Sequence, residues 1–221
     1  MLYLLKMVSK LKRQQVSRRL YRIPKFVAWS FPRRIWFGKN GNVCLTFDDG
    51  PHPEITPWLL DELKINKVKV TFFWKGSQVE KYPKLLKRAI NEGHIVGHHG
   101  YNHHSGKELT FQEFKTNFNK SKVLVKSNFF RPPYGDLNQK QAKYALENGE
   151  VVMWSCMSYD FDADLSITEI LQKAKSDIQN RDILVFHENE KTIHRIKEII
   201  PAIIEIIQNK GLNFALVEKK R

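Results

Sequence analysis

The chain has 221 residues, of which 42% are hydrophobic and 27% charged, an ordinary globular composition that can form a sizeable core. Its two cysteines, Cys44 and Cys156, exclude a disulfide scaffold and a four-cysteine zinc site. Both lie in apolar, strand-like runs, so we expect two reduced thiols in the core. The sequence has no apolar run of about 18 residues, which excludes an ordinary membrane span.

The net charge of +14 is concentrated near the N-terminus. Residues 1–39 contain eleven Lys or Arg and no acidic residue, whereas the other 182 residues contain 26 basic and 23 acidic residues. We therefore predict a basic N-terminal arm over residues 1–39 and one folded domain over residues 40–221. Charge alone specifies little about nucleic acids, and we expect no nucleic-acid partner. We expect the chain to be a monomer.

The arm does not look like a secretory signal, because Lys6 interrupts its apolar stretch and no small-residue cleavage site follows. Its basic residues, together with Trp29 and Trp36, predict peripheral contact with an anionic membrane surface. The alternative is a solvated leader whose aromatic side chains pack on the outside of the domain. Since neither a signal peptide nor a transmembrane helix is visible, a cytoplasmic or membrane-associated protein is expected.

After residue 40, short apolar runs alternate with amphipathic ones. The predicted strands are Val43–Phe47, Val68–Phe73, Ile95–His98, Phe129–Arg131, Val151–Ser155, Ile183–His187 and Asn213–Val217. The predicted helices are Ile55–Leu63, Pro83–Asn91, Thr110–Val125, Asn138–Glu147, Thr168–Ile178 and Ile193–Gln208. This alternation predicts parallel strands with helices outside them. Seven strands favour a closed or nearly closed α/β barrel, with an open doubly wound sheet as the alternative.

Polar residues follow or end five of these strands: Asp48, Asp49, His99, His103, Arg131, Asp160 and His187. In parallel α/β barrels the active site forms at the carboxyl ends of the strands. We therefore expect these side chains to converge on one face.

The adjacent carboxylates of Asp48 and Asp49 are unfavourable after a buried strand unless a cation compensates their charge. One could then bind a metal while the other remains free as a base. The alternative is a polar turn that caps the next helix.

Five of the eight histidines lie within residues 94–104. A His-x-x-x-His spacing presents two imidazoles to zinc, and His94/His98 and His99/His103 both fit it. His94 begins a buried strand and is expected to form a structural hydrogen bond instead. Two histidines and one aspartate leave open coordination positions, which is typical of catalytic zinc. The alternative is a surface cluster of histidines.

Three further residues lie at the same ends of the strands. Arg131 can bind a carboxylate, and Asp48 is its natural partner; the alternative is a rigid rim loop. His187 ends an apolar strand facing the metal cluster, which favours a general acid over a satisfied core histidine. Trp74, after the second strand, could pack at the rim.

The order of these motifs resembles that of the polysaccharide deacetylases of the NodB-homology type, carbohydrate esterase family 4. The resemblance covers about residues 40–217 and rests on TFDDGP, HHGYNHH, RPPYG, YDF and VFH. Departures from the family pattern occur at His98, His104, Met157, Phe161 and Val185. These departures fall on groove-lining and neighbouring positions, so we expect them to change the preference for substrates more than the reaction itself.

The resemblance implies a deformed (β/α)7 barrel and metal-dependent removal of N-acetyl groups from sugars of a glycan such as peptidoglycan or chitin. It implies that Asp49, His99 and His103 bind the metal, which is expected to be Zn²⁺, with Co²⁺ as an alternative. Asp48 would then be the base.

The resemblance also assigns roles to four other residues. Arg131 would orient Asp48, and the backbone N–H of Tyr134 would bind the oxyanion. His187 would protonate the leaving amine, and Asp160 would raise the pKa of that histidine. Trp74 could offer a face on which a sugar ring stacks, as an alternative to packing at the rim. The alternatives are an O-acetyl esterase of the xylan type, an amidase acting on a non-sugar substrate, and a non-catalytic metal- or glycan-binding module.

Overall fold

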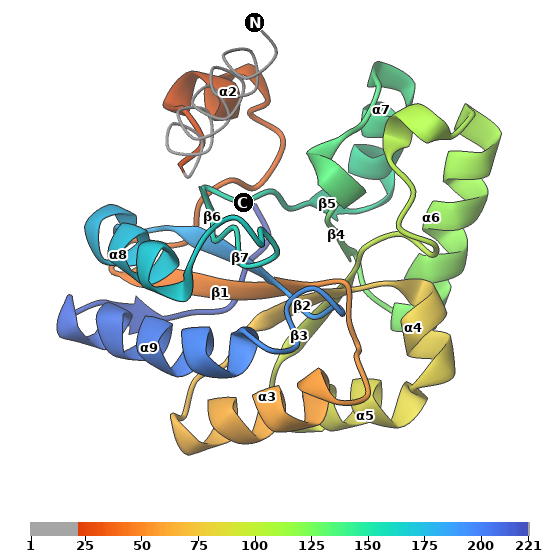
Figure 1. Ribbon diagram of the computed structural model, residues 1–221. Coiled ribbons are helices and arrows are strands. Elements are labelled where there is room, and N and C mark those ends of the chain that lie inside the picture. Colours follow the sequence, from red (N-terminus) through yellow and green to blue (C-terminus); the bar gives the residue numbers. More distant parts are fainter. Residues whose placement is uncertain (1–21, 221) are drawn as a thin grey trace, which may run out of the picture.

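Parallel strands form a curled sheet at the centre of the chain, which the computed structural model describes over residues 22–220 (Figure 1). The strands are β1 (Asn42–Asp48), β2 (Thr71–Trp74), β3 (Ile95–His98), β4 (Phe129–Phe130), β5 (Glu150–Val151), β6 (Cys156–Met157), β7 (Ile183–His187) and β8 (Asn213–Phe214). Their order in the sheet is β5-β4-β3-β2-β1-β7-β6, and β8 pairs with β1. Each of these pairings is parallel.

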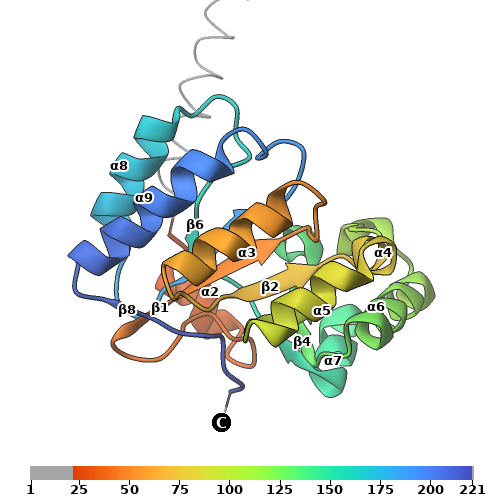
Figure 2. The same ribbon diagram turned by 90° about the horizontal axis from the view of Figure 1, so that it is seen from below.

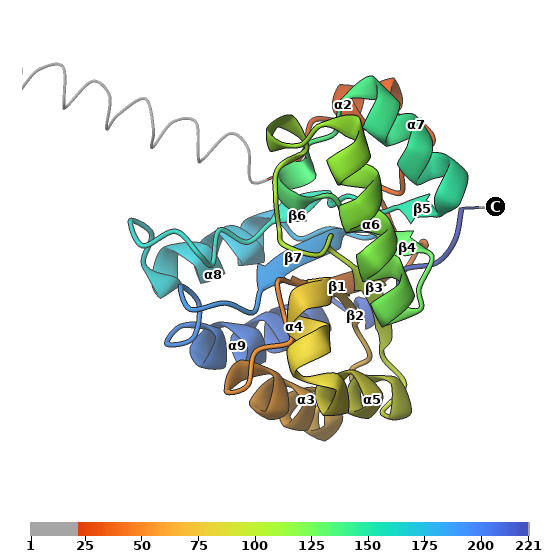
Figure 3. The same cartoon turned by 90° about the vertical axis from the view of Figure 1, so that its right-hand side faces the viewer.

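Helices cover the outside of the sheet. They are α2 (Lys25–Ser30), α3 (Ile55–Ile65), α4 (Gly76–Lys81), α5 (Pro83–Asn91), α6 (Phe111–Val125), α7 (Gln139–Asn148), α8 (Ile167–Asp177) and α9 (Ile196–Asn209). Capping boxes begin three of them, at Thr110, Asn138 and Ser166, where the side chain accepts a hydrogen bond from the third backbone N–H of the helix. Figure 2 shows α8, α9, α3 and α5 side by side across one face, and Figure 3 shows α6 beside α4 and α7.

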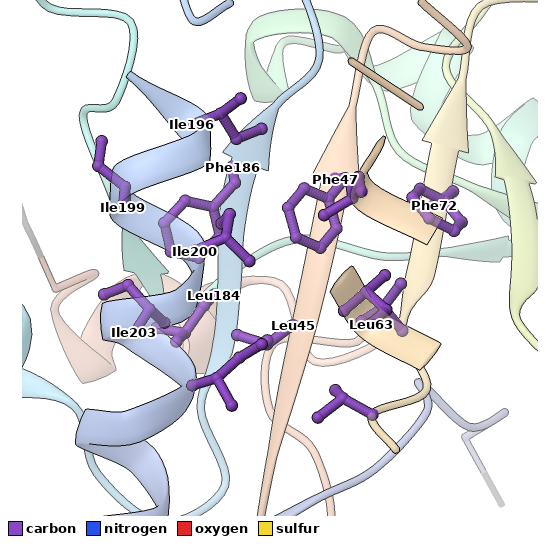
Figure 4. Close-up of a cluster of buried hydrophobic side chains, with 14 of the residues drawn as sticks. Leu45, Phe47, Leu63, Phe72, Leu184, Phe186, Ile196, Ile199, Ile200 and Ile203 are labelled. Carbon is purple, nitrogen blue, oxygen red and sulfur yellow. The ribbon is translucent and has the colours of Figure 1, made fainter. Parts of the chain in front are cut away.

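The main core lies between the sheet and the helices α3 and α9. Alternate residues of β1 and β7 point at one stripe of α9, which is rich in isoleucine because that helix faces the sheet along its whole length (Figure 4). The buried residues labelled there are Leu45, Phe47, Leu63, Phe72, Leu184, Phe186, Ile196, Ile199, Ile200 and Ile203. This packing fixes the ends of β1 and β7, where the polar residues begin. The predicted core thiols are confirmed, because Cys44 and Cys156 are buried and not joined by a disulfide.

The predicted deformed (β/α)7 barrel is confirmed as a single domain. Two strands are shorter than predicted, since β2 begins at Thr71 and not at Val68, and β8 ends at Phe214 and not at Val217.

A larger difference lies at the open edge of the barrel. The strand predicted over residues 151–155 is wrong beyond Val151, and β6 begins only at Cys156. Ile35 lies beside this stretch instead, accepting a hydrogen bond from Met153 N and donating one to Val151 O, both at 2.8 Å. An arm residue therefore bridges part of the gap between β5 and β6.

The described part of the arm, residues 22–39, packs against the barrel. Arg22 forms an ion pair with the buried carboxylate of Asp182 at 2.5 Å, and Trp36 is buried. Trp29 is 74% exposed. Residues 1–21 of the predicted membrane-contacting arm lie outside the described residues, and its division from the domain at residue 39 stays a prediction. Within residues 22–220, no helix has both the length and the apolar character that crossing a membrane requires.

Candidate active site

The polar residues predicted to converge do lie together at the carboxyl ends of the strands. Asp48 ends β1 and His187 ends β7, and the two Cα atoms are register partners in the sheet. Arg131 directly follows β4, and its backbone N–H donates a hydrogen bond to the carbonyl of His98 at the end of β3. Parallel pairing in register thus brings four segments that are distant in sequence to one edge.

Asp49, His99 and His103 form a three-residue group that could hold a metal ion, since one ligand atom of each lies within 4.8 Å of the others. Among residues 22–220, the buried Oδ1 atom of Asp49 has no hydrogen-bond partner and lies 3.1 Å from His103 Nε2. The Oδ2 atom of Asp49 accepts a hydrogen bond from Asn189 Nδ2 at 2.7 Å. The Nδ1 atom of His99 lies 2.7 Å from the carbonyl of Arg131, which leaves Nε2 as the atom that can bind metal. One carboxylate and two imidazoles suit zinc, so the residues present fit such an ion.

The protonation states of this group also suit a cation. Burial lowers the pKa of both His99 and His103 to about 4, so both imidazoles are neutral at pH 7, the form that binds metal. Burial by itself would raise the pKa of Asp49, but the neighbouring His99, His103, His187 and Lys75 lower it to about 2. The aspartate is therefore an anion facing two neutral nitrogen ligands.

The backbone is strained at the same place. Asp49 (φ 78°), His103 (φ 63°) and Tyr134 (φ 58°) all adopt left-handed conformations, which are uncommon for residues other than glycine and concentrate at functional sites. Gly50 follows Asp49, and a Cβ atom there would lie 2.5 Å from Glu188 Oε2. Only glycine fits this close approach.

Asp48 and Arg131 form the predicted contact. Arg131 Nη1 donates hydrogen bonds to Asp48 Oδ1 and to Thr46 Oγ1, each at 2.7 Å, and the guanidinium lies over the ring of Phe73. Arg131 is completely buried. Burial raises the pKa of Asp48, and the Arg131 charge opposes that shift. The ion pair therefore orients the carboxylate and favours its charged form.

His187 and Asp160 form a second buried pair. Asp160 Oδ1 lies 2.8 Å from His187 Nδ1, and its Oδ2 accepts the backbone N–H of His187 at 2.7 Å. Burial lowers the pKa of His187, but Asp160, with smaller contributions from Asp48 and Asp49, outweighs burial and raises that pKa to about 9. The edge of the Phe161 ring packs on the imidazole at 4.9 Å between centroids. His187 thus holds a proton at neutral pH with Nε2 pointing away from Asp160.

Two of the other histidines lie outside the ligand group. His98 is completely buried against the rings of Phe118 and Phe130, and neither ring nitrogen has a hydrogen-bond partner within the described part of the chain. His94 forms the expected structural hydrogen bond, accepting the backbone N–H of Val70 at 3.2 Å. The neighbouring His98 and His99 therefore do point to different surroundings.

Tyr134 lies at the rim of the site. Its side chain is 69% exposed, and its ring meets the edge of the His103 ring at 4.8 Å. This position lets it contact both the metal-binding group and solvent.

The sequence reasoning missed the polar residues that support the site. Glu188 is buried and accepts hydrogen bonds from Trp74 Nε1 at 2.7 Å and Thr56 Oγ1 at 2.5 Å, and burial raises its pKa to about 7. Trp74 is completely buried, so the suggestion that it stacks on a sugar is wrong. Glu188 and Asn189 directly follow His187, and two polar residues after a buried strand were the available clue.

Comparison with known proteins agrees with this geometry. The sequence profile of the family described as polysaccharide deacetylase matches residues 38–152, about half of the chain. The chain belongs to the polysaccharide deacetylase family. The predicted membership of the NodB type, carbohydrate esterase family 4, is thereby confirmed.

Individual members of this family are also similar to the chain in sequence and in structure. A peptidoglycan-N-acetylglucosamine deacetylase of Bacillus cereus is 40% identical over 129 residues, which are 55% of this chain and 47% of that protein. The crystal structure of the Bc1960 peptidoglycan N-acetylglucosamine deacetylase is 30% identical, with a TM-score of 0.76 over 88% of this chain and 99% of that one. The fold also resembles that of a carbohydrate esterase family 4 pseudoenzyme from Bacillus anthracis, with a TM-score of 0.75, 24% identity and coverage of 86% of this chain and 70% of that one.

Proposed function

We propose that this family member is a metal-dependent N-deacetylase of a glycan such as peptidoglycan, yielding acetate and a free amine. The observation that carries the proposal is the group of Asp49, His99 and His103 lying beside two separate buried pairs, Asp48–Arg131 and His187–Asp160. Such a site would hold a metal, a base and an acid together. The names of the relatives support an N-acetylated glycan as the substrate.

Asp49, His99 and His103 would hold the ion, and Asn189 would keep Asp49 turned so that Oδ1 faces it. Bound zinc supplies Lewis-acid chemistry, lowering the pKa of a water molecule to about 7 and polarising the acetyl carbonyl. Zinc is proposed over Co²⁺ because the donor set of one carboxylate and two imidazoles is typical of catalytic zinc.

Asp48 accepts the proton of the attacking water. Its Oδ1 is held by Arg131, so Oδ2, which lies 3.8 Å from His99 Nε2, is the oxygen available on the side of the metal group. The backbone N–H of Tyr134 binds the oxyanion that forms as water adds to the carbonyl. His187 then donates its proton to the leaving nitrogen, the carbon–nitrogen bond breaks, and acetate and the amine are released.

The Asp160→Asn substitution is expected to move the alkaline limb of the pH–rate profile to lower pH. His187 must be protonated to act as the acid, so activity falls as pH rises through the pKa of His187, which Asp160 raises. Removing the carboxylate lowers that pKa towards its ordinary value, by about one unit or more. The measurement is kcat/KM against pH for both proteins. The control is Asp164→Asn, which removes the same charge from an exposed residue. If Asp160→Asn leaves the alkaline limb of the profile unchanged, Asp160 does not raise the pKa of His187.

Acetate release from matched substrates tests the proposed reaction. Purified protein with zinc is incubated with N-acetylated peptidoglycan fragments, chitin oligomers and O-acetylated xylan. We expect release from an N-acetylated glycan at least about tenfold faster than from the xylan. Faster release from xylan supports an O-acetyl esterase instead.

The non-catalytic module stays the second candidate, since a pseudoenzyme shares this fold and the fold alone does not fix activity. The presence of both Asp48 and His187, each with its buried partner, favours catalysis. Glycan binding without acetate release from any substrate supports the module.

A further inference from the structure

A large basic pocket lies at the end of the barrel opposite the candidate active site. It is a half-open pocket of about 1010 Å³, lined by residues from three segments, 22–39, 179–181 and 216–220. These segments precede β1 and β7 or follow β8, whereas the catalytic residues lie where β1 and β7 end. The length of β1 separates the two places by about 20 Å. Figure 1 shows α2 above the sheet, on the side away from α3 and α5.

The charge of the pocket lining is strongly one-sided. Among the described residues that line it, the only acidic one is Glu218, and the basic ones are Arg22, Lys25, Arg34, Lys39, Arg181, Lys219 and Lys220. Lys39 pairs with Glu218 at 2.7 Å, and Arg22 pairs with Asp182. Within residues 22–220, the other five basic side chains form no ion pair. Such a concentration of unpaired positive charge attracts an anion.

Arg34 is the most informative of these five. The residue is only 9% exposed, and its guanidinium stacks on the ring of Phe31 at 4.4 Å. The guanidinium has neither a carboxylate partner nor a hydrogen-bond acceptor among the described residues, although it lines the pocket. Its nitrogen atoms are not among the buried polar atoms that lack a partner, so they face the open pocket and are accessible to an anion that enters it. A phosphate group, which guanidinium binds well, would be such an anion.

Exposed aromatic residues lie on helix α2 and directly after it, and one of them, Trp29, lines this pocket. Phe26, Trp29 and Phe31 are 65%, 74% and 45% exposed. A soluble anion would leave these rings in water, whereas the headgroup region of a lipid bilayer accommodates aromatic rings beside basic residues. The combination of rings and cations therefore favours a lipid surface over a free phosphate.

We propose that this pocket binds the phosphate headgroup of an anionic phospholipid and docks the barrel on a membrane surface. Arg34 contacts the phosphate inside the pocket, Lys25 and Lys219 contact neighbouring headgroups, and Trp29 inserts at the interface. The candidate active site then faces away from the membrane. This docking is independent of the proposed deacetylation.

Sedimentation of the full-length protein with vesicles tests the proposal. We expect binding to vesicles that contain phosphatidylglycerol, no binding to pure phosphatidylcholine, and weaker binding as salt is added. The triple variant Lys25→Gln/Trp29→Ser/Lys219→Gln, which changes exposed residues only, should bind at least about tenfold more weakly. Arg34→Gln should also weaken binding, with folding checked by circular dichroism.

The control is Lys84→Gln/Lys87→Gln, which removes two exposed charges from α5, outside the pocket. This control should bind vesicles like the unchanged protein. All proteins keep residues 1–21, so the comparison isolates the pocket from the rest of the arm. If the triple variant binds anionic vesicles as tightly as the control does, the proposal is overturned. So does tight binding of glycerol phosphate or polyphosphate without any binding to anionic vesicles.

Discussion

Asp48→Asn is expected to keep the bound metal and to lower kcat by about 10² to 10⁴-fold. Asparagine has nearly the same shape, and its Oδ1 can still accept the hydrogen bond that Arg131 Nη1 donates at 2.7 Å to Asp48. The amide cannot take a proton from water, however, so the proposed base is lost. Asp49 and the two histidine ligands are unchanged.

Metal content and acetate release are measured on the same preparation of this variant. Because Arg131 is completely buried, removing the charge of its partner should also lower the free energy of unfolding, which thermal unfolding detects. Activity is therefore compared at a temperature where both proteins are folded. Loss of metal from Asp48→Asn to the same degree as from a ligand variant would mean that the roles of Asp48 and Asp49 are exchanged.

His103→Ala is expected to lose metal and activity together. The substitution leaves Asp49 and His99 as the remaining ligands, and metal affinity should fall by more than about 100-fold, since even a residue that only orients a ligand contributes 10–100-fold. Its side chain is 23% exposed, so the fold should tolerate the change better than a change in the core. The measurement is a zinc titration followed by acetate release at each zinc concentration.

His98→Asn is the matched control, because His98 lies directly before the proposed ligand His99 but is enclosed by Phe118 and Phe130. We expect zinc affinity and activity to remain largely intact, and stability to fall because the smaller side chain leaves space in the core. A hundredfold loss of activity with loss of metal in this control would identify His98 as the ligand.

The periodicity of apolar residues predicts a helix or strand well where that element packs through its own apolar face. The predicted bounds of β3, β7 and α5 agree with the structure, because their apolar runs end at clear polar or glycine boundaries. The sequence did not predict β6 or the short helices α2 and α4. The apolar run after Val151 looked like one strand, but Ile35 of the arm takes up its hydrogen bonds at Val151 and Met153. A contact across more than 100 residues cannot be predicted from local pattern.

The proposed metal ligands could be predicted from the sequence better than the residues that hold them in place. Asp49, His99 and His103 stand out because carboxylates and spaced histidines follow buried strands, and parallel pairing brings strand ends together. Glu188 and Asn189 act through tertiary hydrogen bonds to Trp74 and Asp49, which no spacing in the sequence indicates. The same holds for Arg34, whose burial depends on the folded arm.

Removal and return of zinc tests most directly whether this site performs metal-dependent deacetylation. The unchanged protein is stripped with a chelator, and acetate release from an N-acetylated glycan is followed as zinc is added back. We expect no activity in the stripped protein and full activity at one zinc ion per chain. Full activity of the stripped protein, or zinc binding at one ion per chain without any acetate release, would contradict it.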